Sequence, residues 1–176
     1  MLDKRRIKEA EANVKSYLSE GLIKKSLTNK KVVDILLKNS RESLIVAEEI
    51  YQKNLSDLGV IVCSHYSMFY IANAVLYKSG YKIGEKIVHK VTSDALIVYV
   101  RKKLKENFIE EYENAKDEAL NLAGIKADSL LESFDLEKNK RSFIQYETEE
   151  VEKHSKAKTS LQRAKLFVKE MEKLLV

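Results

Sequence analysis

A short run of positive side chains near the end of the chain holds the residue types best suited to chemistry. Lys138, Lys140 and Arg141 lie within four residues of one another, and Ser142 follows directly. Ammonium and guanidinium groups attract the phosphates of nucleic acids. We therefore take Lys138, Lys140, Arg141 and Ser142 as candidate nucleic-acid or nucleotide-binding residues.

Charge is spread unevenly over the rest of the chain. Residues 106–137 carry ten acidic and two basic side chains, a local charge of −8, so the remainder must carry +13 to give the net charge of +5. Helical proteins rich in Lys and Glu commonly have such segments at a solvated surface. We read most basic groups in this way, including Lys4–Arg6, Lys24–Lys25, Lys30–Lys31 and Arg101–Lys105, and set only the Lys138–Arg141 cluster apart.

Other catalytic patterns are absent from the sequence. It contains no GxxxxGK[ST] phosphate loop, no GxGxxG, no HExxH and no Cys/His zinc pattern. His65, His89 and His154 are far apart along the chain, and nothing marks a Ser-His-Asp set. We therefore predict neither a metal site nor a cofactor. An ordinary hydrolase is unsupported, although distant residues can still assemble a site.

The elements that must position these residues are predicted to be helices. The chain has 176 residues, no proline and only five glycines, which favours one all-α domain with short loops. Apolar residues recur at helical spacing, and Gly21, Gly80 and Gly124 provide stops. The predicted helices cover about residues 4–20, 30–53, 57–79, 85–106, 109–123, 128–141 and 148–175. We expect an up-and-down helical bundle.

The helix at 57–79 is expected at the centre of this bundle. Leu58 to Tyr77 contains no charged residue, whereas 34% of the whole chain is charged. A helix that is apolar on all sides must be surrounded by other helices or by lipid. Polar His65 and Asn73 would be costly at the middle of a bilayer, and no second span or signal pattern is present. The sequence therefore predicts a cytoplasmic protein with no membrane segment, in which the lone Cys63 is inert packing.

Four segments together resemble HEPN domains of prokaryotic type. Arg41–Ile50 (RESLIVAEEI) is similar to the opening helix of that family, and Ser64–Leu76 (SHYSMFYIANAVL) to its central helix. Gly80-Tyr81-Lys82 followed by His89 resembles the family's glycine turn and the histidine that leads its next helix. Arg141–Tyr146 (RSFIQY) resembles the closing motif. The resemblance covers about residues 38–105 and 128–175, and it leaves 1–27 as an N-terminal helical extension and 106–127 as an acidic helical insertion.

The resemblance implies a helical bundle that forms a homodimer. Many members are toxins partnered with a small nucleotidyltransferase, and catalytic members are metal-independent ribonucleases with an Arg-x(4–6)-His motif at the dimer cleft. Arg141 matches the arginine of that motif, which stabilises the negative charge of the phosphorane that forms during attack. Apolar Phe167 and Leu174, which flank the main stripe of the last helix, are the expected dimer contacts.

Tyr146 stands where the resemblance leads us to expect a histidine. Tyrosine has a pKa near 10, so it is a poor general base at neutral pH, although it can donate a proton or a hydrogen bond. His154 could enter the same cleft and is therefore a fifth candidate nucleic-acid or nucleotide-binding residue, although its position on the stripe with Leu161 favours a satisfied core or interface histidine. Arg141 could equally anchor a helix end. A non-catalytic or degenerate module that binds RNA, a nucleotide or a protein is therefore favoured over an active endoribonuclease that uses Arg141 and Tyr146.

Overall fold

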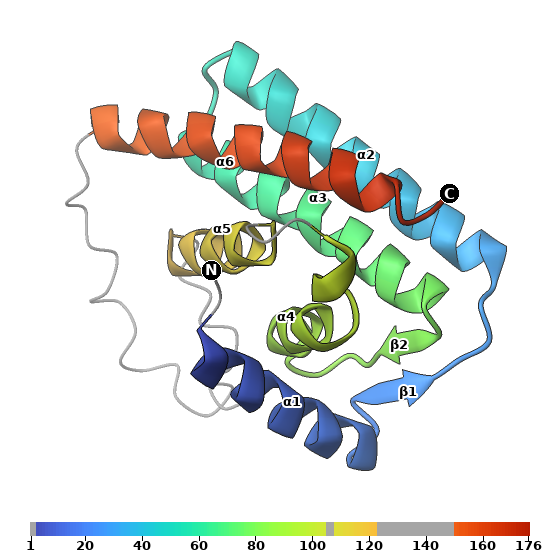
Figure 1. The fold of residues 1–176 in the computed structure, drawn as a ribbon. Helices are drawn as coiled ribbons and strands as arrows, with labels where there is room; N and C mark the ends of the chain where they lie inside the picture. The colour runs from blue at the N-terminus through green and yellow to red at the C-terminus, as the bar shows by residue number, and fades with distance from the viewer. Residues whose placement is uncertain (1–2, 105–107, 123–149) are drawn as a thin grey trace, which may run out of the picture.

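The protein is a helical bundle with one small two-stranded antiparallel sheet, which we call the hairpin although two helices separate its strands in the chain (Figure 1). The computed structural model describes residues 3–104, 108–122 and 150–176. Helices account for most of these residues, as the composition predicted. The elements in chain order are α1 (Lys4–Ser19), β1 (Ile23–Lys25), α2 (Lys30–Gln52), α3 (Asp57–Lys78), β2 (Tyr81–Ile83), α4 (Val88–Tyr99), the 3₁₀ turn η1 (Arg101–Lys103), α5 (Phe108–Leu122) and α6 (Glu150–Glu172).

Helix α3 lies at the centre of the bundle. Helices α2 and α6 pack along it, and α4 and α5 cover another side (Figure 1). Side chains such as Met68, Ile71 and Leu76 are fully buried there. Although α3 is long and apolar enough to cross a membrane, these helices cover most of it, which is the environment of a core helix in a soluble protein. The predicted central helix is confirmed.

The ends of the first three helices are capped by side chains or by glycines. The Asn29 side chain accepts a hydrogen bond from the Lys31 N–H at 2.9 Å, and the Ser56 hydroxyl accepts one from the Gly59 N–H at 3.0 Å. Such caps satisfy backbone N–H groups that have no partner within the helix. Gly21 and Gly80 follow α1 and α3 with φ of +74° and +90°, a left-handed conformation that glycine adopts at no steric cost.

The two strands were not predicted. β1 pairs with β2 in antiparallel register, with Ile23 opposite Ile83, Lys24 opposite Lys82 and Lys25 opposite Tyr81. Each strand has three residues, too few for a period-2 pattern to stand out from the flanking turns. The pairing also joins segments on either side of α2 and α3, which no local pattern can reveal.

Helix α4 is shorter than predicted. It spans Val88–Tyr99 rather than about 85–106, and η1 follows it. Ile87 precedes it at φ 42°, a left-handed conformation that is rare for a β-branched residue. The loop from β2 occupies the positions before it, since the Gly84 N–H donates to the Leu22 carbonyl at 2.8 Å. This hydrogen bond beside the hairpin thus keeps the preceding residues out of the helix, which begins only at Val88.

Helix α6 buries most of the predicted stripe and further residues beside it. Leu161, Ala164, Val168 and Met171 of that stripe are buried, as are Ala157, Ser160 and Phe167, whereas His154 and Lys158, which the sequence also placed on the stripe, are exposed. Phe167 stacks on Tyr112 of α5 with ring centroids 5.4 Å apart. Phe167 is therefore a core residue, and the expectation that it makes a dimer contact is wrong. The helix predicted at about 128–141 lies outside the described residues.

A charged network fastens α1 to α4 and α5. The Arg6 guanidinium lies 2.6 Å from the Asp94 carboxylate and 2.7 Å from that of Glu113. Asn13 and Tyr17 of α1 each donate to Asp94 Oδ2 at 3.0 Å. We call Arg6, Asn13, Tyr17, Asp94 and Glu113 the α1 clamp, and in it each charge faces an opposite charge.

Candidate nucleic-acid interface

Two lysines face each other across the hairpin. Lys24 and Lys82 are direct partners in the antiparallel register, and both are exposed. Side chains alternate along a strand, so these two lie on one face of the hairpin, while Ile23 and Ile83 lie on the other. Like charges directly opposite one another destabilise a strand pair. The hairpin therefore carries a positive charge that does not serve its own stability.

Three more exposed lysines lie in the neighbouring segments. Lys25 lies in β1 opposite Tyr81, on the other face from Lys24 and Lys82, and Lys30 and Lys31 form the first turn of α2. The amino end of a helix favours negative groups, yet the first turn of α2 contains no acidic residue. We call Lys24, Lys25, Lys30, Lys31 and Lys82 the basic hairpin surface. Among the described residues, no carboxylate lies within 4.0 Å of any of these five ammonium groups.

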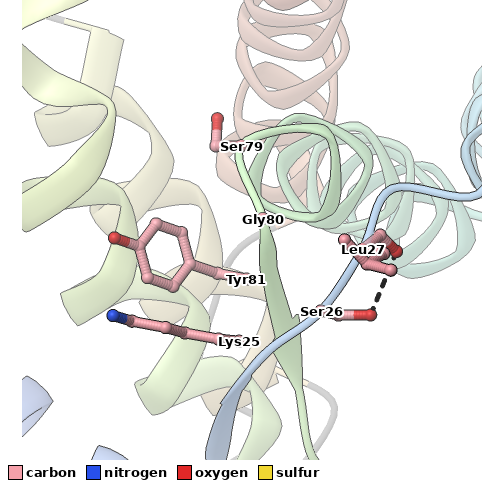
Figure 2. Close-up of a pocket in the computed structure, with 6 residues that line it drawn as sticks. All are labelled: Lys25, Ser26, Leu27, Ser79, Gly80 and Tyr81. Atoms are coloured by element: carbon pink, nitrogen blue, oxygen red, sulfur yellow. Dashed lines mark hydrogen bonds between the residues drawn. The ribbon is translucent and has the colours of Figure 1, made fainter.

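An open pocket of about 430 Å³ lies at the junction of α3 with the hairpin. It is lined by Lys25, Ser26, Leu27, Ser79, Gly80 and Tyr81. Figure 2 shows the side chains of Lys25 and Tyr81 extending to one side of the hairpin, and those of Ser26 and Leu27 to the other. The polar groups of this pocket do not converge on one point, as they do in a small-molecule site. The pocket and the lysines around it therefore better suit a chain of phosphates than an enclosed ligand.

An aromatic stack connects the hairpin to a further basic segment. The rings of Tyr81 and Tyr99 lie 3.7 Å apart and nearly parallel, at 13°. Burial, together with Tyr81, raises the pKa of Tyr99 to about 12, so its hydroxyl stays protonated at neutral pH. Arg101, Lys102 and Lys103 of η1 follow shortly after Tyr99. The stack thus places the start of this basic turn close to the hairpin.

Most of the site residues predicted from sequence fall outside the described part of the chain. These are Lys138, Lys140, Arg141, Ser142 and Tyr146. Their roles stay predictions.

His154 is described, and it makes a surface contact with a carboxylate. Its Nδ1 lies 3.0 Å from the Asp57 carboxylate, and its ring stacks on Tyr51 with centroids 5.3 Å apart. The side chain is 48% exposed, so it is not a core histidine. These contacts connect the first turns of α6 to the end of α2 and the start of α3.

The structure brings together two histidines that the sequence separates. His65 Nε2 and His89 Nδ1 lie 3.2 Å apart, between α3 and α4. Burial lowers the pKa of His65 to about 3, with contributions from His89 and Lys116, and burial also lowers the pKa of His89. Both rings are therefore neutral at neutral pH, and one donates to the other. His65 is only 1% exposed, so the pair acts as a buried polar contact rather than as a general base.

The described residues offer few other reactive groups. No three His, Cys, Asp or Glu side chains among them are grouped to hold a metal ion. Burial raises the pKa of the Cys63 thiol, so it stays protonated and weakly nucleophilic at neutral pH. The basic hairpin surface is therefore the candidate site in this part of the chain. From the sequence, Lys24–Lys25 and Lys30–Lys31 are read as ordinary solvated surface, because the pairing of Lys24 with Lys82 exists only in the fold.

The comparisons with known proteins add no further guide. No protein-family model matches the chain, and neither a curated protein nor a solved structure matches it.

Proposed function

We propose that this chain is a HEPN-like helical-bundle protein that binds RNA or a nucleotide in the cytoplasm. In this proposal it is a non-catalytic or degenerate member of a toxin–antitoxin-like system and pairs with a nucleotidyltransferase. The observation that carries the binding role is the basic hairpin surface, where Lys24 and Lys82 oppose each other and no carboxylate of the described residues neutralises them. Phosphates would supply the missing negative charge.

The arrangement of helices is compatible with the HEPN part of the proposal. The segment that resembles the family's central helix lies in α3 and is surrounded by α2, α4, α5 and α6. The glycine turn falls at Gly80, and His89 lies in the first turn of the next helix. These positions support the proposal, because the segments that resemble the family's motifs lie in consecutive elements that pack against one another.

The direct test measures RNA affinity when the opposed lysines are neutralised. We expect K24Q/K82Q to weaken binding of a single-stranded RNA about tenfold at low salt, since two phosphate contacts are lost. The matched control is K8Q/K15Q, which removes the same net charge from exposed positions on α1. An equal loss in both double variants would mean that net charge alone, and not the hairpin, attracts RNA.

A second experiment separates binding from cleavage. The purified protein is incubated with total RNA in EDTA, beside the Arg141→Ala variant. We expect neither protein to cleave RNA, because Tyr146 cannot serve as a general base at neutral pH. Cleavage that persists in EDTA and disappears in Arg141→Ala would replace the binding role with that of an active metal-independent endoribonuclease.

A further inference from the structure

Four aromatic side chains form a cluster where α3 meets α4. Tyr66, Phe69 and Tyr70 lie on one face of α3, because residues three and four apart are neighbours on a helix. His89 of α4 contacts this face, with its ring centroid 4.6 Å from that of Phe69 and 6.0 Å from that of Tyr66. We call Tyr66, Phe69, Tyr70 and His89 the aromatic cluster.

The three rings of α3 in this cluster do not belong to the hydrophobic core. They are partly exposed, and in the described part of the chain they do not pack against either group of buried apolar side chains. Their contacts are edge-on, since the ring planes of Tyr66 and Phe69 meet at 85° and those of Phe69 and Tyr70 at 60°. An edge contact leaves ring faces that the neighbouring ring does not cover. The cluster therefore offers apolar ring surface that the fold itself does not use.

Positive charge flanks the aromatic cluster. Lys86 and Lys90 lie close to His89 in the chain and are exposed, and no carboxylate of the described residues lies within 4.0 Å of either ammonium group. Glu85 is the one acidic residue between positions 84 and 90, so two positive charges and one negative charge give this segment a net charge of +1. Lys116 of α5 is also near, because its charge adds to burial in lowering the pKa of His89.

We propose that the aromatic cluster stacks on unpaired bases of single-stranded RNA, a role that rests on the proposed RNA binding and adds a second contact to the basic hairpin surface. Proteins that bind single strands combine aromatic rings for the bases with positive side chains for the phosphates. An apolar peptide would use the rings but not the ammonium groups, and an acidic peptide would use only the ammonium groups. Bases inside a duplex are already stacked, so duplex RNA would gain little here.

The aromatic cluster and the basic hairpin surface are close enough for one RNA strand. Strand β2 ends at Ile83, and His89 follows in the first turn of α4. Even a fully extended chain between these two residues spans no more than about 22 Å. Single-strand sites commonly hold roughly 4–16 nucleotides. A strand whose phosphates meet Lys24 and Lys82 therefore has bases within reach of the rings.

The test compares two ligands of equal charge, an oligouridylate of about ten nucleotides and an abasic chain of the same length. We expect the wild type to bind the oligouridylate about tenfold more tightly, since stacking on one aromatic side chain contributes that much or more. Tyr70→Leu should remove most of this preference, and Tyr70→Phe, which keeps the ring, should retain it. Tyr51→Leu is the matched control, because Tyr51 is also partly exposed but stacks on His154. K24Q/K82Q should weaken both ligands equally.

A fluorescent variant reads the stacking directly. The chain contains no tryptophan, so Tyr70→Trp introduces a single indole into the aromatic cluster. We expect the oligouridylate to quench its fluorescence and the abasic chain to leave it unchanged. Leu166→Trp is the control, at a position of α6 that is 59% exposed, and neither ligand should quench it. This measurement stands in for Tyr70→Leu if circular dichroism shows that Tyr70→Leu fails to fold.

The outcomes separate this inference from the proposed function. Equal affinity of the wild type for the two ligands, or an undiminished preference in Tyr70→Leu, would overturn base stacking and leave the basic hairpin surface as a phosphate site. A protein partner would then be the better occupant of the rings. A wild type that binds neither ligand at low salt would overturn the proposed RNA binding itself, and base stacking with it.

Discussion

Charged side chains are paired with opposite charges in the α1 clamp, whereas those of the basic hairpin surface are not. In the clamp, Arg6 lies between Asp94 and Glu113, and Tyr17 and Asn13 bind the same Asp94 carboxylate. In the hairpin, Lys24 faces Lys82, with no carboxylate within 4.0 Å among the described residues. Paired and buried charges position a helix, whereas unpaired and exposed charges remain available to a ligand. The difference separates residues that hold this fold from those that we propose to bind RNA.

Breaking the clamp should have the largest effect on stability. Asp94 is fully buried, so Asp94→Ala leaves the partly exposed Arg6 without its closest partner and removes two further hydrogen bonds. We expect the free energy of unfolding to fall by about 3 kcal/mol, as for other broken buried pairs. Urea unfolding measures the change. Asp34→Ala, at an exposed position on α2, should change it by no more than about 0.5 kcal/mol. Equal effects would show that the clamp is not a stabilising contact.

The second largest effect should be a loss of folding stability in acid, caused by the buried histidine pair. The pKa of His65 is lowered from its ordinary value of 6.5 to about 3 in the folded chain, so the unfolded chain binds this proton more readily. The stability that depends on neutral His65 is therefore fully present above about pH 6.5 and is lost progressively as the pH falls towards 3. We expect urea unfolding midpoints to fall between about pH 7.5 and about pH 5.

The variant His65→Asn should flatten this pH dependence, while His154→Asn should keep it. His154 is the matched control because it is exposed and belongs to a surface pair with Asp57. If His65→Asn retained the full loss of stability in acid, another group would be responsible.

Giving the hairpin a partner charge should have the smallest effect on stability, and the opposite sign. Lys82→Glu converts the opposed lysines into a cross-strand ion pair with Lys24. We expect stability to rise by roughly 0.2–1 kcal/mol, as measured by thermal unfolding. RNA affinity should fall at the same time, because the local positive charge is removed. A variant that gains stability and keeps its RNA affinity would show that the lysine pair does not contribute to RNA binding.

The sequence anticipated the helices better than the contacts between them. Asn29 and Ser56 cap α2 and α3 as their residue types suggested, and the uncharged stretch from Leu58 is the central helix. Such features are local, since they depend on residues a few positions apart. Phe167 was misplaced because a periodic stripe does not say how widely a helix is covered, and α6 is covered more widely than one stripe.

The candidate site depends on contacts between distant segments. Lys24 meets Lys82, and His65 meets His89, only after the chain has folded. Neither pair lies at a spacing that a motif search reads. The Arg141 cluster was visible because its residues are neighbours in sequence, and it stays a prediction.

The most direct test of the proposed function is the salt dependence of RNA binding. The slope of log affinity against log salt concentration is measured for the wild type, K24Q/K82Q and K8Q/K15Q. For single-stranded RNA each phosphate contact contributes about 0.7 to the slope, so we expect K24Q/K82Q to lower its magnitude by about 1.4 and K8Q/K15Q to leave it unchanged. A wild-type affinity that does not vary with salt, or a slope that K24Q/K82Q leaves intact, would contradict the role of the basic hairpin surface.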